Sequence, residues 1–168
     1  AGPTQEAMDP VRFLSNHSTG KMGYAIAARA AMRGADATLV SGPTALDTPH
    51  GVTRVDIVSA RDMYDAVTSR APEQDFIIKA AAVGDYRPAQ TADDGEMNIE
   101  LTRNPDILAA LGKDKKPGQL LCGFAMETQN LLDNAESKLR RKNCDMLVAN
   151  SLRDKGAGFG SDTNVATL

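Results

Sequence analysis

Strand and helix signals alternate along almost the whole chain of 168 residues, and this alternation limits the possible folds more than any other feature. Residues 20–33 are rich in alanine and end before Gly34, a common helix terminator. Residues 53–58 are expected to form a strand with one buried face, because Val55 and Ile57 alternate with polar neighbours. Such alternation is typical of parallel strands joined by right-handed crossovers. The sequence therefore predicts an α/β fold, a Rossmann-like three-layer α/β/α sandwich with a mainly parallel sheet.

Capping residues mark two further helix starts. Ser59, with Asp62 three residues later, forms a capping box that predicts a helix through residue 67. Asn104 followed by Pro105 predicts a second start, with the asparagine as the cap and the proline in the first turn. The other expected elements are strands at 37–40, 76–83, 97–101, 119–124, 144–149 and 164–168 and a helix at 131–142, with an irregular link over 86–96.

Composition argues against several classes of protein. The net charge of −3 gives no basic footprint for nucleic acid, so no polynucleotide partner is expected. No apolar run approaches the roughly 20 residues that cross a bilayer. Cys122 and Cys144 lie in apolar runs and are expected to be buried thiols of a reducing compartment, which favours the cytoplasm. With His17 and His50 as the only histidines, no metal-ligand spacing can be assembled, and no protein metal site is predicted.

Both ends of the sequence suggest a piece of a longer protein. The chain begins at Ala1 without an initiator methionine, and the strand expected at 164–168 reads as if interrupted midway. A chain of this length buries roughly 70% of its unfolded surface and fits one ordinary domain. We therefore expect residues 1–168 to form a single domain of a longer chain.

Residues 15–23 carry the clearest chemical motif. They place a hydroxyl, Ser18, and two glycines, Gly20 and Gly23, at a helix start. Backbone N–H groups there can point at a polyphosphate that the glycines allow to approach. The alternative on these residues alone is a helix cap with tight helix–sheet packing. The dinucleotide fingerprint fails, because Ser18 replaces its first glycine and the next strand ends at Ser41 without an acidic residue. A phosphate site is predicted, but not an NAD site of that kind.

Other side chains offer binding chemistry, each with a structural alternative. Arg12 could clamp an anion or form a salt bridge, and Asn16 could donate to an oxyanion or cap a helix. Asp85 could hold a ribose or a metal-bound phosphate, or merely belong to a turn. Lys138 and Lys142 lie four residues apart on one helix face, which is also the pattern of a solvated basic surface.

Together these stretches resemble the phosphopantothenate–cysteine ligase family. The resemblance follows the order of the whole chain and is most specific over 9–23; the matching stretches are 1–6, 9–23, 80–86, 103–106, 123–128, 138–143, 149–150 and 158–162. The chain is similar to the bacterial form, which is usually the second half of a protein whose first half is a flavin-dependent decarboxylase. It is therefore expected to be a nucleotide-binding ligase domain.

The resemblance implies a reaction of coenzyme A biosynthesis. The enzyme would join L-cysteine to 4′-phosphopantothenate, using CTP with Mg²⁺ through an acyl-cytidylate and releasing pyrophosphate and CMP. The family precedent is a homodimer. By the same resemblance, Asn16 grips the acyl group and Arg12 is the other catalytic position, while Gly2, Ser18, Gly20 and Gly23 hold the triphosphate. The remaining nucleotide-binding positions would be Lys79, Ala80, Ala81, Asp85, Asn104, Pro105, Asp106, Ile107, Leu108, Phe124, Lys138 and Lys142.

One departure from the family stands out after Asp85. The family carries a lysine-rich loop there, whose first lysine serves nucleotide activation, whereas here Ala92 runs straight into Asp93. Either the protein lacks the loop, or the numbering closes over missing residues. Two other functions stay open on sequence alone: an NAD(P)- or flavin-binding oxidoreductase, and a non-catalytic nucleotide-sensing module. The choice of CTP over ATP is open as well.

Overall fold

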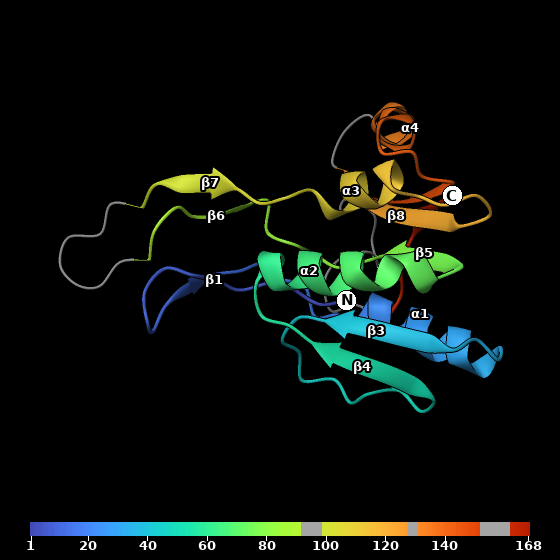
Figure 1. The fold of residues 1–168 in the computed structure, drawn as a ribbon, viewed down its shortest axis with the longest axis horizontal. Helices are drawn as coiled ribbons and strands as arrows, with labels where there is room; N and C mark the ends of the chain where they lie inside the picture. Colours follow the sequence, from blue (N-terminus) through green and yellow to red (C-terminus); the bar gives the residue numbers. More distant parts are fainter. Residues whose placement is uncertain (92–98, 128–130, 152–161) are drawn as a thin grey trace. The chain divides into compact units, whose positions relative to one another are not determined.

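The computed structural model describes residues 1–91, 99–127, 131–151 and 162–168 (Figure 1). They fall into two compact units. Unit 1 comprises Ala1–Val67 and Ala81–Pro105, and unit 2 comprises Thr68–Ala80 and Asp106–Leu168. That the whole chain behaves as one domain stays a prediction. No helix in the described ranges is long and apolar enough to cross a membrane.

Unit 1 is built around helix α1, Lys21–Met32, and the parallel strands β3, Ala37–Ser41, and β4, Val52–Asp56. The buried side chains of Tyr24, Ala27 and Leu39 join helix and sheet into a core. The helix and both strands fall within one or two residues of the ranges predicted from sequence. Local patterning therefore decides this part of the fold.

The remainder of unit 1 consists of short pairs of strands and the start of a second helix. The capping box is confirmed: the Asp62 N–H donates to Ser59 Oγ at 3.1 Å, and the Ser59 N–H donates to Asp62 Oδ2 at 2.8 Å. The helix it opens is α2, Ala60–Arg70. The other elements are the antiparallel pairs β1, Glu6–Ala7, with β2, Phe13–Leu14, and β6, Tyr86–Pro88, with β7, Leu101–Arg103.

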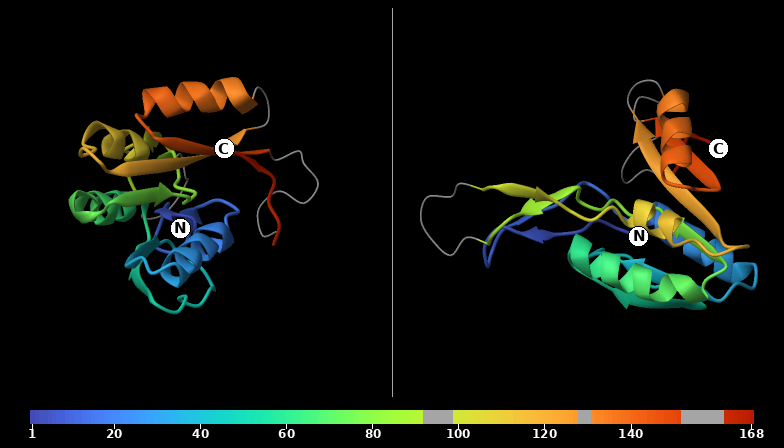
Figure 2. Two further views of the ribbon diagram at one scale, coloured as in Figure 1. Left: turned by 90° about the vertical axis from the view of Figure 1, so that its right-hand side faces the viewer. Right: turned by 45° about the horizontal axis from the view of Figure 1, so that its top comes forward.

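Unit 2 holds a four-stranded sheet (Figures 1 and 2), in which the strands lie in the order β10, Ala166–Thr167; β9, Met146–Ser151; β8, Leu120–Glu127; and β5, Phe76–Lys79. Strands β5, β8 and β9 run parallel, and β10 is antiparallel to β9. Leu108 of α3 and Leu147 of β9 pack against Gly123 of β8, where a Cβ would come within 2.9 Å of both side chains. The remaining elements of this unit are η1, Ala71–Glu73; α3, Ile107–Lys113; and α4, Leu131–Arg141.

The predicted fold class, α/β with mainly parallel strands, is confirmed, but several predicted element boundaries were wrong. The strand expected at 76–83 ends at Lys79. Ala82 instead forms a parallel bridge with Pro3 of unit 1, because the backbone groups of Ala82 find partners there. The link expected to be irregular contains strand β6, and of the strand expected at 97–101 only Leu101 falls in an observed strand, β7. Residues 92–98, where the departure from the family lies, are outside the described residues.

Candidate functional site

The predicted phosphate loop, residues 15–23, leads into the start of α1. Gly20 is the N-cap residue, with a φ of 81° in the left-handed region that favours glycine. The Ser18 hydroxyl accepts a 3.4 Å hydrogen bond from the Gly20 N–H, and the Ser18 N–H donates to Asn16 Oδ1 at 3.0 Å. The loop thus enters the helix through side-chain contacts within itself, and its position at a helix N-terminus suits an anionic ligand.

Gly2 and Gly20, far apart in sequence, come together beside Thr44. A Cβ at either glycine would lie within 3.2 Å of Thr44 Cγ2, and one at Gly2 would also lie 3.1 Å from the Gly42 oxygen. Gly2 shares the positive φ, at 73°. Close packing is therefore enough to require both glycines, as in the alternative weighed from sequence. Their contact with a triphosphate stays a prediction.

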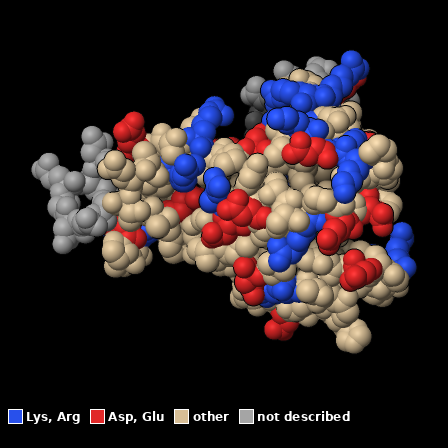
Figure 3. Space-filling model, in the orientation of Figure 1, with Lys and Arg blue, Asp and Glu red and all other residues tan. Residues whose placement is uncertain are grey.

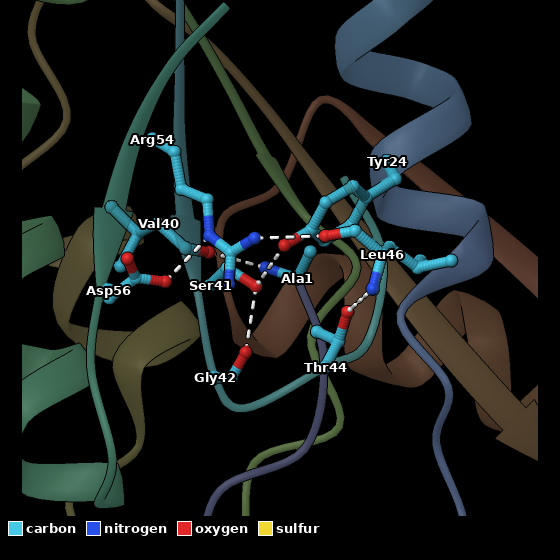
Figure 4. A network of polar contacts seen from close by, with 9 residues as sticks. All are labelled: Ala1, Tyr24, Val40, Ser41, Gly42, Thr44, Leu46, Arg54 and Asp56. Carbon is cyan, nitrogen blue, oxygen red and sulfur yellow. Dashed lines mark hydrogen bonds and ion pairs between the residues drawn. The ribbon is translucent and has the colours of Figure 1, made fainter. Parts of the chain in front are cut away.

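A polar network supports the loop that follows β3 (Figure 4). The hydroxyl groups of Tyr24 and Ser41 lie 3.0 Å apart, and Ser41 Oγ donates to the Gly42 oxygen at 2.8 Å. The guanidinium of Arg54 lies 5.6 Å from the Tyr24 ring centre and donates to the Leu46 oxygen at 3.0 Å. Ser41 is fully buried and bonded internally. The end of β3 therefore presents no acidic side chain for a dinucleotide ribose.

Asn16 ties the phosphate loop to the segment after β5. Its Nδ2 donates to the Ala82 oxygen at 2.6 Å, while its Oδ1 accepts the bond from Ser18. The Ala82 N–H donates to the Gly2 oxygen at 3.0 Å. An amide nitrogen carries two hydrogens, and the bond to Ala82 uses one of them. The asparagine is thus a brace of the loop that keeps donor capacity.

Arg12 forms the salt bridge that sequence reasoning offered as the alternative to an anion clamp. Its Nε lies 2.5 Å from Asp9 Oδ2, and its side chain is 65% exposed. Hydrogen bonds from the Val11 and Arg12 N–H groups, more than the guanidinium itself, lower the pKa of Asp9 from its ordinary value. Asp9 was not identified from sequence as the partner of Arg12. The Asp9-Pro10 step is a turn signal that could have indicated this contact.

Asp85 lies exposed on a turn that two other residues hold. Asn104 Nδ2 donates to the Gly84 oxygen at 2.8 Å, and the Asn104 N–H donates to the Asp85 oxygen at 2.8 Å. Arg87 Nη1 donates to Asn104 Oδ1 at 3.0 Å. The prediction that Asn104 caps the next helix was wrong, because its amide is committed to these contacts within unit 1.

The actual cap of α3, in unit 2, is Asp106. Its Oδ1 accepts from the Ala109 N–H at 2.9 Å, and its Oδ2 forms an ion pair with Lys142. Burial pushes the pKa of Asp106 upward, but the bond from Lys142, the bond from the Ala109 N–H and the charge of Lys79 together hold it below its ordinary value. Two of the predicted nucleotide-binding residues therefore contact each other here.

The other predicted lysine, Lys138 on α4, donates to the Phe124 oxygen at 3.2 Å. Basic side chains gather over this helix in Figure 3, and its last turn contains Lys138, Arg140 and Arg141.

The two thiols of unit 2 differ in burial. Cys144 is buried as predicted, Cys122 is only half-buried, and burial raises the pKa of both. A raised pKa disfavours the nucleophilic thiolate.

The predicted positions divide between the two units. Ile107 and Leu108 are 3% exposed and pack into the core of unit 2, so only their backbone could meet a ligand. Unit 1 holds Gly2, Arg12, Asn16, Ser18, Gly20, Gly23, Ala81, Asp85, Asn104 and Pro105. Unit 2 holds Lys79, Ala80, Asp106, Ile107, Leu108, Phe124, Lys138 and Lys142.

The chain belongs to the family described as the DNA/pantothenate metabolism flavoprotein C-terminal domain, which matches residues 1–168. It is 48% identical over 178 residues to the coenzyme A biosynthesis bifunctional protein CoaBC of Vibrio parahaemolyticus. That alignment covers 100% of this chain and 44% of the relative, so the chain spans less than half of its length. Because the alignment is longer than the 168-residue chain, it contains relative residues that have no counterpart here.

Solved structures give the same assignment. The crystal structure of the C-terminal domain of a coenzyme A biosynthesis bifunctional protein CoaBC matches with a TM-score of 0.83 and 53% identity, over 89% of this chain and 74% of that one. A Cab2 mutant in complex with phosphopantothenate-cysteine matches with a TM-score of 0.74 over 91% of this chain and 71% of that one. Its identity of 17% supports the fold alone. The chain therefore has the Rossmann-like α/β fold of these domains.

Proposed function

We propose that this chain is the ligase domain of a coenzyme A biosynthesis enzyme, joining L-cysteine to 4′-phosphopantothenate with CTP. The observation that carries the proposal is the match of the whole chain to one family, together with a relative that is named for coenzyme A biosynthesis. The complex of the Cab2 mutant with phosphopantothenate-cysteine adds a product of this chemistry on a similar fold. The reaction would yield phosphopantothenoylcysteine, CMP and pyrophosphate.

In the first half-reaction, the phosphopantothenate carboxylate attacks the α-phosphate of CTP and pyrophosphate leaves. Its barrier is mainly electrostatic, so N–H groups and cations aimed at the phosphates should dominate. The loop from Ser18 to Gly20 supports this role in unit 1 because it opens α1, a helix of 12 residues. By the family resemblance, Lys138 and Lys142 of unit 2 would supply cations; in the free protein they bind the Phe124 oxygen and the Asp106 carboxylate, contacts that a triphosphate would have to share or replace.

Mg²⁺ would accompany CTP and offset the negative charge of its phosphates. Proteins hold Mg²⁺ with one or two carboxylates and leave further positions to substrate phosphates and water. The part of the chain that the structure describes contains no group of three or more potential ligands. The exposed carboxylate of Asp85 fits a metal that arrives already bound to a nucleotide.

In the second half-reaction, the cysteine amine attacks the acyl carbon and CMP leaves. We assign to Asn16 the stabilisation of the oxyanion that forms on that carbon, through the amide hydrogen that is not engaged by Ala82. Arg12 would act near the same loop, with Asp9 fixing the direction of its guanidinium. By the family resemblance, we further propose a homodimer, fusion to a flavin-dependent decarboxylase domain and a cytoplasmic location.

The test is to incubate the protein with CTP, Mg²⁺, 4′-phosphopantothenate and L-cysteine and to follow pyrophosphate. We expect release that requires both CTP and 4′-phosphopantothenate, and a phosphopantothenoylcysteine product identified by mass spectrometry. ATP in place of CTP tests the choice of nucleotide. Absence of release, or oxidation of NAD(P)H by the same protein, would contradict the proposal.

A further inference from the structure

The peptide groups of Gly84, next to the predicted site residue Asp85, are held on both sides by side chains. The Gly84 N–H donates to Thr4 Oγ1 at 2.9 Å, and the Gly84 oxygen accepts from Asn104 Nδ2 at 2.8 Å. These partners lie 80 and 20 residues away in sequence. The conformation of this turn therefore depends on two distant side chains rather than on local sequence.

Thr4 is the more deeply buried of the two partners, at 1% exposure, and it has a second link. Its backbone oxygen accepts a 2.8 Å hydrogen bond from the Ser15 hydroxyl, at the start of the phosphate loop. Next to it, Pro3 bridges Ala82, the residue whose oxygen receives the Asn16 amide. Thr4 thus lies between the Asn16 loop and the Asp85 turn and is bonded to both.

We infer that Thr4 is a positioning residue of the ligase: its hydroxyl fixes the Asp85 turn relative to the loop that carries Asn16. The inference rests on the proposed function. The physical reason is that the Gly84 N–H is paired with the hydroxyl of Thr4, a side chain that is almost fully buried, so loss of this acceptor leaves the N–H unpaired beside a fixed part of the structure and allows the turn to shift. Misplacement by an ångström is enough to slow a reaction about a hundredfold.

Three substitutions separate this role from general stability. Thr4→Val keeps the shape but removes the acceptor, while Thr4→Ser keeps the acceptor. Gln119→Leu is the matched control, because Gln119 is also buried and its Nε2 donates to the Ala71 oxygen at 2.7 Å, in unit 2 and among no predicted site residues. Ser15→Ala removes the second link from an exposed position, where the fold tolerates change.

We expect Thr4→Val to lower kcat by about tenfold to a hundredfold, with a smaller change in the KM for CTP. Amide exchange at Gly84, followed by NMR without any substrate, should become faster in Thr4→Val and return to the wild-type rate in Thr4→Ser. The kcat of Thr4→Ser should recover, and Gln119→Leu should melt at a lower temperature yet keep the wild-type kcat. Ser15→Ala should lower kcat by less than Thr4→Val does.

Several outcomes would overturn the inference. Wild-type kcat in Thr4→Val, or unchanged exchange at Gly84, removes the positioning role, and so does an equal loss of kcat in Gln119→Leu. If Thr4→Val does not fold, wild-type kcat in Ser15→Ala decides against the inference and a reduced one supports it. An inactive wild-type protein is a different result, because it rejects the proposed function itself, and the inference falls with it.

Discussion

The two units of this chain hold their predicted functional residues in different ways. In unit 1, Asn16 and Asn104 brace backbone oxygens, and Gly20 fits against Thr44. In unit 2, Lys138 lies in the last turn of α4 and Lys142 directly follows the helix, and each donates to one oxygen: that of Phe124 and that of the Asp106 carboxylate. Substitutions in unit 1 should therefore change fold and function together. Substitutions of the unit 2 lysines should change ligand binding with little effect on folding.

The largest effect is expected in unit 1 at Gly20. Gly20→Ala places a side chain in the left-handed region and 3.2 Å from Thr44, and should lower the free energy of unfolding by about 2–3 kcal/mol in urea denaturation. It should also weaken CTP binding. Gly34→Ala is the matched control, since Gly34 has a similar φ of 88° but nothing within 4 Å of its Cβ position. Equal losses in the two variants would show that crowding at Thr44 does not matter.

Glu6 gives the next largest effect, also in unit 1. This buried carboxylate accepts a 2.9 Å hydrogen bond from the N–H of Ala60, the first residue of α2. Glu6→Ala should lower the free energy of unfolding by about 1–3 kcal/mol, because it leaves that buried N–H without its acceptor. Glu6→Gln keeps an acceptor oxygen and should lose less. Equal stability of Glu6→Ala and the wild type would show that the hydrogen bond from Ala60 to Glu6 does not stabilise α2.

In unit 2, the effect of a substitution at Lys138 should fall on ligand binding. Lys138→Gln should raise the KM for CTP, by an amount that corresponds to about 1.5–3 kcal/mol for one charge-assisted bond. The free energy of unfolding should stay within about 0.5 kcal/mol. Arg140→Gln is the control, because Arg140 pairs with Glu136 on the exposed surface of the same helix. An unchanged KM in Lys138→Gln would leave Lys138 as a structural contact to the Phe124 oxygen and contradict its role in nucleotide binding.

The smallest effect concerns the ion pair of Asp106 and Lys142. Because the folded pKa of Asp106 is lowered, its contribution is present above the unfolded aspartate value of about 3.9 and is lost as pH falls through the lower folded value. Thermal melting from neutral pH to acid should show Asp106→Asn slightly less stable than the wild type, with the difference vanishing at the acid end. The asparagine still caps α3, which isolates the charge. A difference that persists in acid would assign the loss to the cap.

Local sequence was sufficient for some parts of the molecule. Alanine content and a terminal glycine placed α1 within a residue at each end, and the Ser59 box placed α2, because both signals act over three or four residues. The local structure of the predicted phosphate loop follows from its own residues for the same reason, while its phosphate ligand stays a prediction. Its residues contact one another within five positions.

The parts that could not be predicted depend on distant partners. The sequence around Asn104 resembles a helix cap, but its side-chain amide donates to the Gly84 oxygen. The N-cap of α3 is Asp106, two residues later. Thr4 and Glu6 carry no local signal, since their partners lie 80 and 54 residues away. The family resemblance supplied the candidate site positions, which stay predictions, but it did not show which of these residues contact one another.

The most direct test of the account follows both half-reactions of the Asn16→Asp variant in one rapid-quench experiment. The substitution removes the donor to Ala82 and to the oxyanion and places a negative charge beside an anionic intermediate, and loss of such a donor typically costs on the order of 10²–10³ in rate. We expect pyrophosphate release and an acyl-cytidylate detectable by mass spectrometry, but little transfer to cysteine. Transfer at the wild-type rate would contradict the assignment and leave Asn16 as a structural brace.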